Sequence, residues 1–297
     1  MFATLPVHLL DAACDEDLGP AGDITSALLP GGMVDVTARV VPRQAGVVCG
    51  LALGPAICDV FSRRLGQSLE FTPATDGARQ WRDGDRVARG TAVATVSGTH
   101  SAVLTVERTL LNFLGRMSGV ATLTRRYVEA ARPSNPEVQI LDTRKTLPGW
   151  RVLDKIAVRA GGGENHRFGL YDAILIKDNH LSGVPVERLA AWLTERLSGK
   201  PAAARFVEVE VDSLAQFAEV CRVAHVDYVL LDNFPLDQMR AAVAQRDALG
   251  LRDKLALEAS GGVTLDTIAD IAATGVDRIS VGALTHSAAS LDIGLDL

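Results

Sequence analysis

The chain has 297 residues, of which 47% are hydrophobic and 22% charged, and its formal net charge at pH 7 is −6. This composition supports one or two folded domains and excludes disorder as the main state. The acidic balance argues against a broad surface for nucleic acid or acidic membranes, since such surfaces need clustered Lys and Arg. Any anion-binding site must therefore be local.

Cysteine use and the N-terminal segment favour a cytoplasmic protein. The four cysteines are scattered without a CxxC pair, which is typical of reduced, buried thiols. The first thirty residues lack a basic start followed by an apolar run, so no secretory signal is expected. The sequence also lacks an uninterrupted apolar stretch of about 18 residues, so no membrane partner is expected.

The N-terminal part is predicted to be a small α+β domain. Helices are expected from near Pro6 and over residues 51–65, with a turn or cap at residues 22–26. Between and after them, β-rich runs are punctuated by Gly, Pro and Asp. These predicted strands lie at residues 34–41, 46–50, 69–73 and 86–98.

A long helical pattern from Ser101 to Arg132 links the two parts of the chain and ends at Pro133. Gly115 and Gly119 predict an interruption that divides it into two helices. We place the domain boundary there, which gives an N-terminal domain of residues 1–115 and a second domain of residues 116–297. The last residues of the chain are allowed to pack back on the N-terminal domain.

After Pro133, apolar strand-like runs alternate with amphipathic helical segments. This alternation is typical of parallel βαβ units, and the lack of a GxGxxG motif favours a barrel over a doubly wound sheet. Ligands of such folds bind at the C-terminal ends of the strands. The predicted strands lie at residues 138–142, 173–177, 206–211, 228–232, 254–259 and 278–281.

Each of these strands ends on charged or small polar residues, a series that solvated helix caps explain poorly. One group is cationic, and its guanidinium forks suit carboxylates or phosphates. Gathering these cations costs self-repulsion that an anionic ligand relieves, so a substrate with several negative charges is expected. The group comprises Arg144, Lys145, His166, Arg167 and Lys177.

A second group pairs carboxylates with glycines. Glu210 and Asp232 end neighbouring strands and can bind Mg²⁺, directly or through water, or sugar hydroxyls. For either residue alone, an ion pair with a nearby lysine is an equal alternative. The glycines of residues 259–262 and 281–284 let backbone N–H groups approach a phosphate, with a tight βα turn as the alternative.

The run GGGENHR at residues 161–167 is unusual because three consecutive glycines cost backbone entropy without adding packing. A loop that closely approaches a ligand explains it. His166 within this loop is either catalytic or an ordinary loop histidine, and the sequence leaves both interpretations open.

An ordered series of motifs extends over nearly the whole chain. It comprises GDITS from Gly22, ERTLLNFLGRMSG from Glu107, LDTRKTLPGWR from Leu141, GGGENHR from Gly161, DAILIKDNH from Asp172, EVEVDS from Glu208, LLDNF from Leu230 and EASGGV from Glu258. Together these motifs resemble the quinolinate phosphoribosyltransferases, also called carboxylating nicotinate-nucleotide pyrophosphorylases. The resemblance implies an N-terminal α/β sandwich domain and an incomplete, open parallel α/β barrel. Glu164 departs from it, because a small or hydroxyl residue is expected there.

The resemblance also implies an activity: phosphoribosyl transfer from phosphoribosyl pyrophosphate (PRPP) to quinolinate with decarboxylation. The products are nicotinate mononucleotide, pyrophosphate and CO₂, as in de novo NAD synthesis. The implied catalytic residues are Lys145, Lys177, Glu210 and Asp232. The implied substrate-binding residues are these four with Arg108, Thr143, Arg144, His166, Arg167, Ser260, Gly261, Gly262, Val281, Gly282 and Ala283.

Within this set the resemblance implies distinct roles. Arg108, Arg144, His166, Arg167 and Lys177 shape the quinolinate pocket, and Lys145 lies near the pyrophosphate. Ser260 to Gly262 and Val281 to Ala283 hold phosphate. Mg²⁺ is expected with PRPP near Glu210 and Asp232, without a protein side chain assigned as a direct ligand.

A homodimer with shared active sites is expected, in which Arg108 comes from the partner subunit; further assembly into a hexamer stays open. Leu110, Leu111, Phe113 and Leu114 beside Arg108 predict an apolar face for association. A surface ion pair of Arg108 with Glu107 is the alternative.

Two other functions fit parts of the sequence. A paralogue on the same scaffold, acting on another anionic acceptor, is disfavoured by the intact cationic set. A non-catalytic phosphate-binding module needs only the glycine-rich loops, and the presence of Lys145, Lys177, Glu210 and Asp232 together argues against it.

Overall fold

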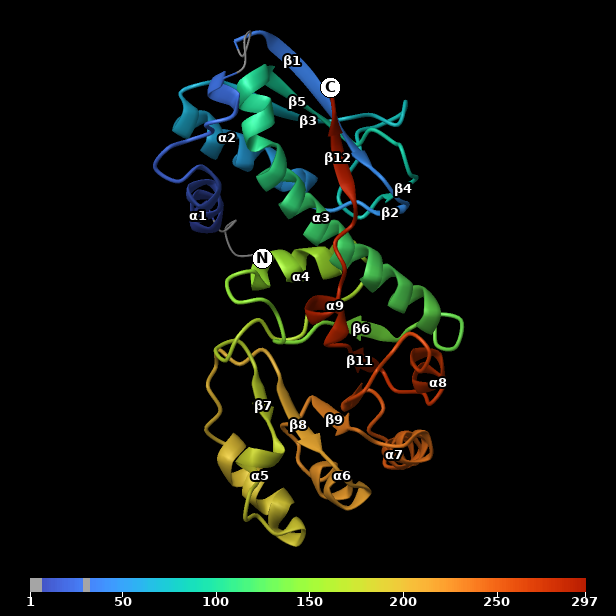
Figure 1. Ribbon diagram of the computed structural model, residues 1–297. Helices are drawn as coiled ribbons and strands as arrows, with labels where there is room; N and C mark the ends of the chain where they lie inside the picture. The colour runs from blue at the N-terminus through green and yellow to red at the C-terminus, as the bar shows by residue number, and fades with distance from the viewer. Residues whose placement is uncertain (1–6, 29–32) are drawn as a thin grey trace. The chain divides into compact units, whose positions relative to one another are not determined.

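The computed structural model describes residues 7–28 and 33–297, and Figure 1 shows the course of the chain. The described chain forms two compact units. Unit 1 contains the described residues up to 125 together with 147–162 and 287–297, and unit 2 contains 126–146 and 163–286. The division at residue 125 falls later in the chain than the boundary predicted at residue 115, and residues 147–162, predicted for the second domain, belong to unit 1.

Unit 1 is built around an antiparallel sheet. Its strands, in spatial order, are β12 (Ile293–Asp296), β1 (Asp35–Pro42), β5 (Ala94–Thr99) and β3 (Leu69–Pro73). Burial alternates along the first part of β1, with Ala38 and Val40 inside and Arg39 exposed, as expected of a strand covered on one face. Helix α2 (Gly54–Leu65) packs on β3, and α1 (Val7–Leu18) packs on α2.

The predicted strands of this unit are confirmed, with one division. The run at residues 86–98 forms two strands, β4 (Arg86–Val87) and β5, and β4 pairs with β2 (Gly46–Val47). The helix expected over residues 51–65 begins as a 3₁₀ turn at Leu51–Leu53 and continues as α2. Another 3₁₀ turn lies at Ser26–Leu28, and unit 1 also contains α4 (Arg151–Ala160) and most of α3 (His100–Ala131).

The prediction that Gly115 and Gly119 interrupt the long helix is wrong. Helix α3 runs without a break from His100 to Ala131. The two glycines serve close approach, because the C-terminal segment crosses the helix there. The Leu291 N–H donates to the Gly115 carbonyl at 2.9 Å, and a side chain at Gly119 would overlap the carbonyl oxygen of Ala289.

Unit 2 is an open, parallel sheet with helices between the strands. Within residues 126–286 the strand order is β6 (Gln139–Leu141), β11 (Arg278–Ser280), β10 (Ala256–Ser260), β9 (Tyr228–Asp232), β8 (Val207–Val211) and β7 (Ile174–Ile176). All six predicted strands are confirmed, and β6 and β7 are the two edges of the incomplete barrel.

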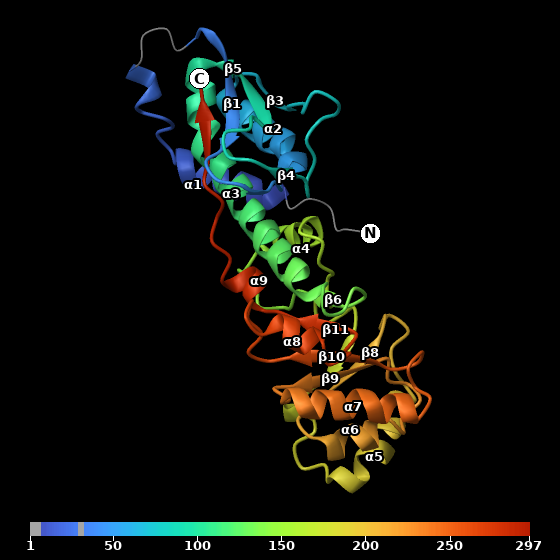
Figure 2. The same ribbon diagram turned by 90° about the vertical axis from the view of Figure 1, so that its right-hand side faces the viewer.

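Helices cover the outer face of this sheet. Figures 1 and 2 both place α5, α6 and α7 on the same side of its strands. The helices of unit 2 are α5 (Leu189–Leu197), α6 (Leu214–Val220), α7 (Leu236–Ala248), α8 (Ile268–Ala272) and α9 (Ala283–His286), with 3₁₀ turns at Asp178–His180 and Val186–Arg188. In the part of the chain that the structure describes, none of the helices combines the length and apolar character needed to cross a membrane.

Strand β8 places two buried glutamates inside the barrel. Its sequence VEVEV alternates apolar and charged residues, yet all five residues are buried. Parallel strands are covered on both faces, so Glu208 and Glu210 point into the barrel although their spacing is that of a half-exposed strand. Buried carboxylates need cationic or hydrogen-bonding partners, and the partners lie at the strand ends described below.

Gly119→Ala tests the close approach at α3. The added methyl group meets backbone atoms of Ala289 and Ser290, and overpacking of this kind costs about 3 kcal/mol. The gain in helix propensity is only about 1 kcal/mol. We therefore expect Tm, followed by circular dichroism, to fall by about 4–8 °C. Gly199→Ala is the control, because no described atom lies within 4 Å of a Cβ there; equal Tm for both variants would contradict the assignment.

Candidate active site

A cavity of about 680 Å³ opens at the C-terminal ends of the strands in unit 2. It gathers residues that the sequence places at separate strand ends and loops, as expected for this class of fold. The predicted site residues that line it are Thr143, Arg144, Lys145, His166, Arg167, Lys177, Glu210, Asp232, Ser260, Gly261, Gly262, Gly282 and Ala283.

Two predicted site residues do not line this cavity. Val281 is 1% exposed, and its N–H donates to the carbonyl oxygen of Leu141 at 2.9 Å, so its side chain belongs to the core. Arg108 lies in unit 1, where its side chain is 68% exposed and its guanidinium is 4.0 Å from Glu107. It lines another cavity, of about 420 Å³, with residues that include Leu147 and Trp150.

The apolar residues beside Arg108 do not form the association face that the sequence predicts. Leu110, Leu111, Phe113 and Leu114 are between 0 and 4% exposed within the single chain. Phe113 stacks on the ring of Trp150, with centroids 4.8 Å apart. These side chains therefore belong to the core of unit 1.

Glycines at the cavity allow two close approaches. A side chain at Gly261, where φ is +95°, would overlap the side-chain amide of Asn233. A Cβ at Gly282 would lie 3.2 Å from Cδ of Lys145, whose carbonyl accepts a 2.7 Å hydrogen bond from Thr285 Oγ1. The tight-turn interpretation of these glycines therefore has a direct structural basis, and their role toward phosphate stays a prediction.

The two predicted carboxylates have different partners. Lys177 Nζ donates to Glu210 Oε2 at 2.5 Å, so Glu210 forms the ion pair that was its alternative interpretation. Asp232 instead accepts a 2.8 Å hydrogen bond from the side chain of Asn233. Asn233 itself adopts a left-handed φ of 54°, and its N–H donates to the Ser260 carbonyl at 2.9 Å.

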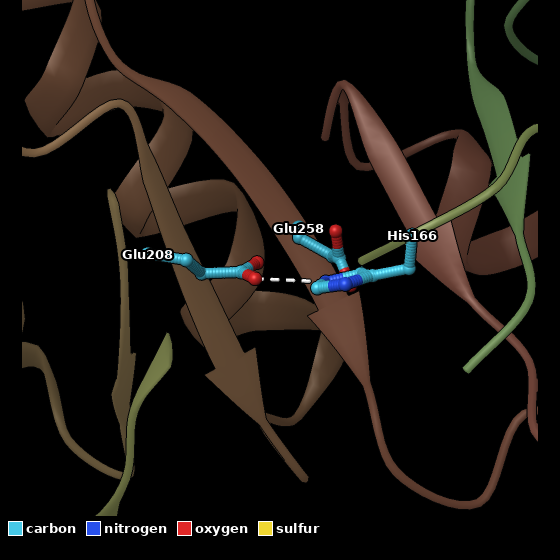
Figure 3. A group of neighbouring side chains, drawn as sticks. All are labelled: His166, Glu208 and Glu258. Carbon is cyan, nitrogen blue, oxygen red and sulfur yellow. Dashed lines mark ion pairs between the residues drawn. The ribbon is translucent and has the colours of Figure 1, made fainter. Parts of the chain in front are cut away.

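His166 lies beside two buried glutamates, as Figure 3 shows. Its Nε2 is 2.8 Å from Glu208 Oε2 and 3.4 Å from Glu258 Oε1, and both carboxylates are 0% exposed. Arg278 Nε is 3.2 Å from Glu258 Oε2, and its guanidinium carbon is 3.9 Å from the centre of the Tyr228 ring. These four residues, His166, Glu208, Glu258 and Arg278, form a buried charge cluster.

The cluster changes the protonation of its members. Burial by itself lowers the pKa of His166, whereas the hydrogen bonds and charges of Glu208 and Glu258 raise it. Burial and the charge of Glu258 raise the pKa of Glu208. His166 Nδ1 accepts the N–H of Arg167 at 2.7 Å, which places the ring proton on Nε2, facing the carboxylates.

Sequence reasoning counted His166 among the cations of the pocket and missed its acidic partners. Glu208 and Glu258 were both inside motifs, but neither was a predicted site residue. The available signal was a glutamate inside an apolar strand of a parallel sheet. His166, Glu208 and Glu258 offer three possible metal ligand atoms within 4.8 Å of one another, but Arg278 already supplies positive charge there, which disfavours a cation.

Two protein-family models match the chain. The family model described as "Quinolinate phosphoribosyl transferase, N-terminal domain" matches residues 23–118, and the model of the C-terminal domain matches residues 120–296. The chain belongs to the quinolinate phosphoribosyl transferase family. The family assignment and the fold predicted from the sequence are thereby confirmed.

Individual members of the quinolinate phosphoribosyl transferase family resemble the chain over nearly its full length. It is 43% identical to the carboxylating nicotinate-nucleotide pyrophosphorylase of Mycobacterium leprae, covering 96% of this chain and 94% of the relative. It is 37% identical to a decarboxylating quinolinate phosphoribosyltransferase of Nicotiana tabacum, covering 97% and 81%. The solved nicotinate-nucleotide pyrophosphorylase of Francisella tularensis superposes with a TM-score of 0.84 at 33% identity, covering 100% and 98%.

Proposed function

We propose that this protein transfers the phosphoribosyl group of PRPP to the ring nitrogen of quinolinate and decarboxylates the product to nicotinate mononucleotide. The observation that carries the proposal is the cavity of unit 2. It brings four cations, three carboxylates and two glycine turns together around about 680 Å³. In a member of this family, that combination suits a dicarboxylate and a sugar phosphate bound side by side.

The cations suit quinolinate. Arg144 and Arg167 line one cavity, and burial together with the like charge of Arg144 lowers the pKa of Arg167. A bound carboxylate relieves this repulsion, and a guanidinium fork binds it in a bidentate manner. Lys177 is 43% exposed and can turn from Glu210 toward a ligand carboxylate. Two carboxylates on adjacent ring carbons therefore have cationic partners.

The glycines, a lysine and two carboxylates of the same cavity suit PRPP. Gly261 and Gly262 have positive φ values of +95° and +60°, which free backbone N–H groups to face a phosphate. Lys145 lines the same cavity and is assigned to the pyrophosphate. Glu210 and Asp232 are assigned to the ribose hydroxyls, which can donate hydrogen bonds to the two carboxylates.

Mg²⁺ fits this donor set as a companion of PRPP. Glu210 and Asp232 both line the cavity, and Mg²⁺ is commonly held by one or two carboxylates with phosphate oxygens and water. When bound, Mg²⁺ neutralises charge that develops on the departing pyrophosphate. The residues that would hold it, through water, are Glu210 and Asp232.

The chain's own residues orient the reaction. The quinolinate nitrogen forms a bond to C1′ of PRPP as the bond to pyrophosphate breaks, and the carboxylates of Glu210 and Asp232 stabilise the positive charge that develops on the ribose. Alkylation makes the ring cationic, so the bond to the 2-carboxylate breaks with the electron pair left on the ring carbon, which then gains a proton. Cationic side chains that hold the substrate carboxylates supply orientation for both steps.

The proposed activity predicts strong selection of quinolinate over nicotinate. Nicotinate lacks the 2-carboxylate, and cations built to bind that group would face it unpaired. We expect kcat/KM for nicotinate to be lower by about 10⁴-fold or more. The assay supplies PRPP, Mg²⁺ and either acid, and follows nucleotide and CO₂ release together. Equal kcat/KM for the two acids would refute the proposed function.

We propose that the protein is a homodimer in which Arg108 completes the active site of the partner subunit. Arg108 is highly exposed, and its distance of 4.0 Å from Glu107 is at the outer limit of an ion pair. Leu147, which lines the same cavity of unit 1, is 47% exposed. An exposed cation and an exposed leucine at one cavity suit contact with a second copy of the chain.

Complementation tests the shared site. Arg108→Ala and Lys177→Ala homodimers should each be nearly inactive. In an equal mixture with random subunit exchange, half the dimers are mixed, and each mixed dimer has one site free of both changes. Activity should then recover to about a quarter of the wild-type level, as two-fold symmetry requires. No recovery after demonstrated exchange would place Arg108 outside the partner's site.

A further inference from the structure

The buried charge cluster occupies a position at which charge is costly. Its two carboxylates are fully buried, and one oxygen of each lies within 4.8 Å of the other and of His166 Nε2. Like charges at this distance repel, and apolar side chains of the same size often stabilise a core equally well. This unfavourable burial of charge occurs beside the cavity, which His166 and Glu258 both line.

The cluster is connected to the cavity by an ion pair and two hydrogen bonds. Glu208 faces the Nε2–H of His166, and the opposite ring nitrogen, Nδ1, accepts the N–H of Arg167 at 2.7 Å. The His166 N–H in turn donates to Oδ1 of the fully buried Asp142 at 3.0 Å. Both peptide N–H groups around the His166–Arg167 step are therefore fixed, one by the imidazole and one by Asp142.

This series of contacts requires one tautomer of the His166 ring. Nδ1 can accept the Arg167 N–H only when the ring proton is on Nε2, and carboxylates facing Nε2 favour that arrangement. Figure 3 shows both carboxylates beside the His166 ring, and both lie within 3.4 Å of its Nε2 atom. Arg278 beside Glu258 balances the second negative charge.

We propose that Glu208 and Glu258 are positioning residues of the quinolinate site: they orient His166, and His166 fixes the main chain from which Arg167 enters the cavity. The inference rests on the proposed function for the identity of the ligand. Glu208 lies outside the cavity lining and acts only through His166, whereas Glu258 also borders the cavity. Neither residue is assigned a contact with the reacting atoms.

Glu208→Gln and Glu258→Gln test the proposal with little change of shape. A glutamine can present its NH₂ group to Nε2, which favours the tautomer with the proton on Nδ1 and breaks the bond to the Arg167 N–H. We expect KM for quinolinate to rise by about tenfold or more, as for other partners that orient a ligand-binding side chain. KM for PRPP should stay within about twofold.

Asp85→Asn is the matched control. Asp85 forms an ion pair with Arg79 at 2.6 Å in unit 1, its side chain is 19% exposed, and neither residue lines the cavity. This variant breaks a carboxylate–guanidinium pair without involving any residue of the cluster. It should lower Tm and leave both KM values unchanged. If it produces the same selective rise in KM for quinolinate, general destabilisation explains the effect and the proposal is refuted.

The tautomer is measured directly by ¹⁵N NMR of protein labelled at histidine, with His166→Gln used to assign the resonance. In the wild type we expect an N–H at Nε2 and an unprotonated Nδ1, and in the glutamine variants the reverse. This measurement needs no turnover, so it distinguishes failure of the cluster from failure of the proposed activity. A wild-type proton on Nδ1, or equal changes in both KM values, would overturn the proposal even if one glutamine variant does not fold.

Discussion

The pairing of buried carboxylates with cations is the interaction on which the site depends. A parallel sheet is covered on both faces, so every glutamate that its central strands carry is withdrawn from water. Glu208, Glu210 and Glu258 each meet a basic partner: His166, Lys177 and, for Glu258, both His166 and Arg278. The fold therefore brings basic side chains to the strand ends before any substrate is considered, and the anion-binding character of the cavity follows from the architecture.

The strands and the cavity could be predicted from the sequence because their signals are local. Apolar runs of about five residues separated by amphipathic helices determine a βαβ order, and the order places the strand ends on one edge. Thirteen of the fifteen predicted site residues line one cavity for this reason. The exceptions are informative: Val281 follows a strand but points into the core, and Arg108 lies outside the barrel unit.

What the sequence could not supply are contacts between distant segments. Gly119 has the same local signature whether it interrupts a helix or admits a crossing chain, and only the C-terminal segment distinguishes the two. The partners of His166 come from two strands far along the chain, and the alternation in VEVEV is equally that of a strand exposed on one face. In both cases the contacting residues are distant in the sequence. The periodicity of the local sequence therefore predicts the wrong surroundings for Gly119 and for the glutamates of β8.

The pairing of β12 with β1 has a consequence for synthesis of the protein. Strand β12 is an edge of the unit 1 sheet, yet it is translated after every strand of unit 2. While the ribosome is still making the barrel, β1 has an open edge with unpaired N–H and C=O groups, of the kind that recruits other strands. The nascent N-terminal sheet must therefore remain incomplete during most of translation, and this edge stays open until the final residues emerge.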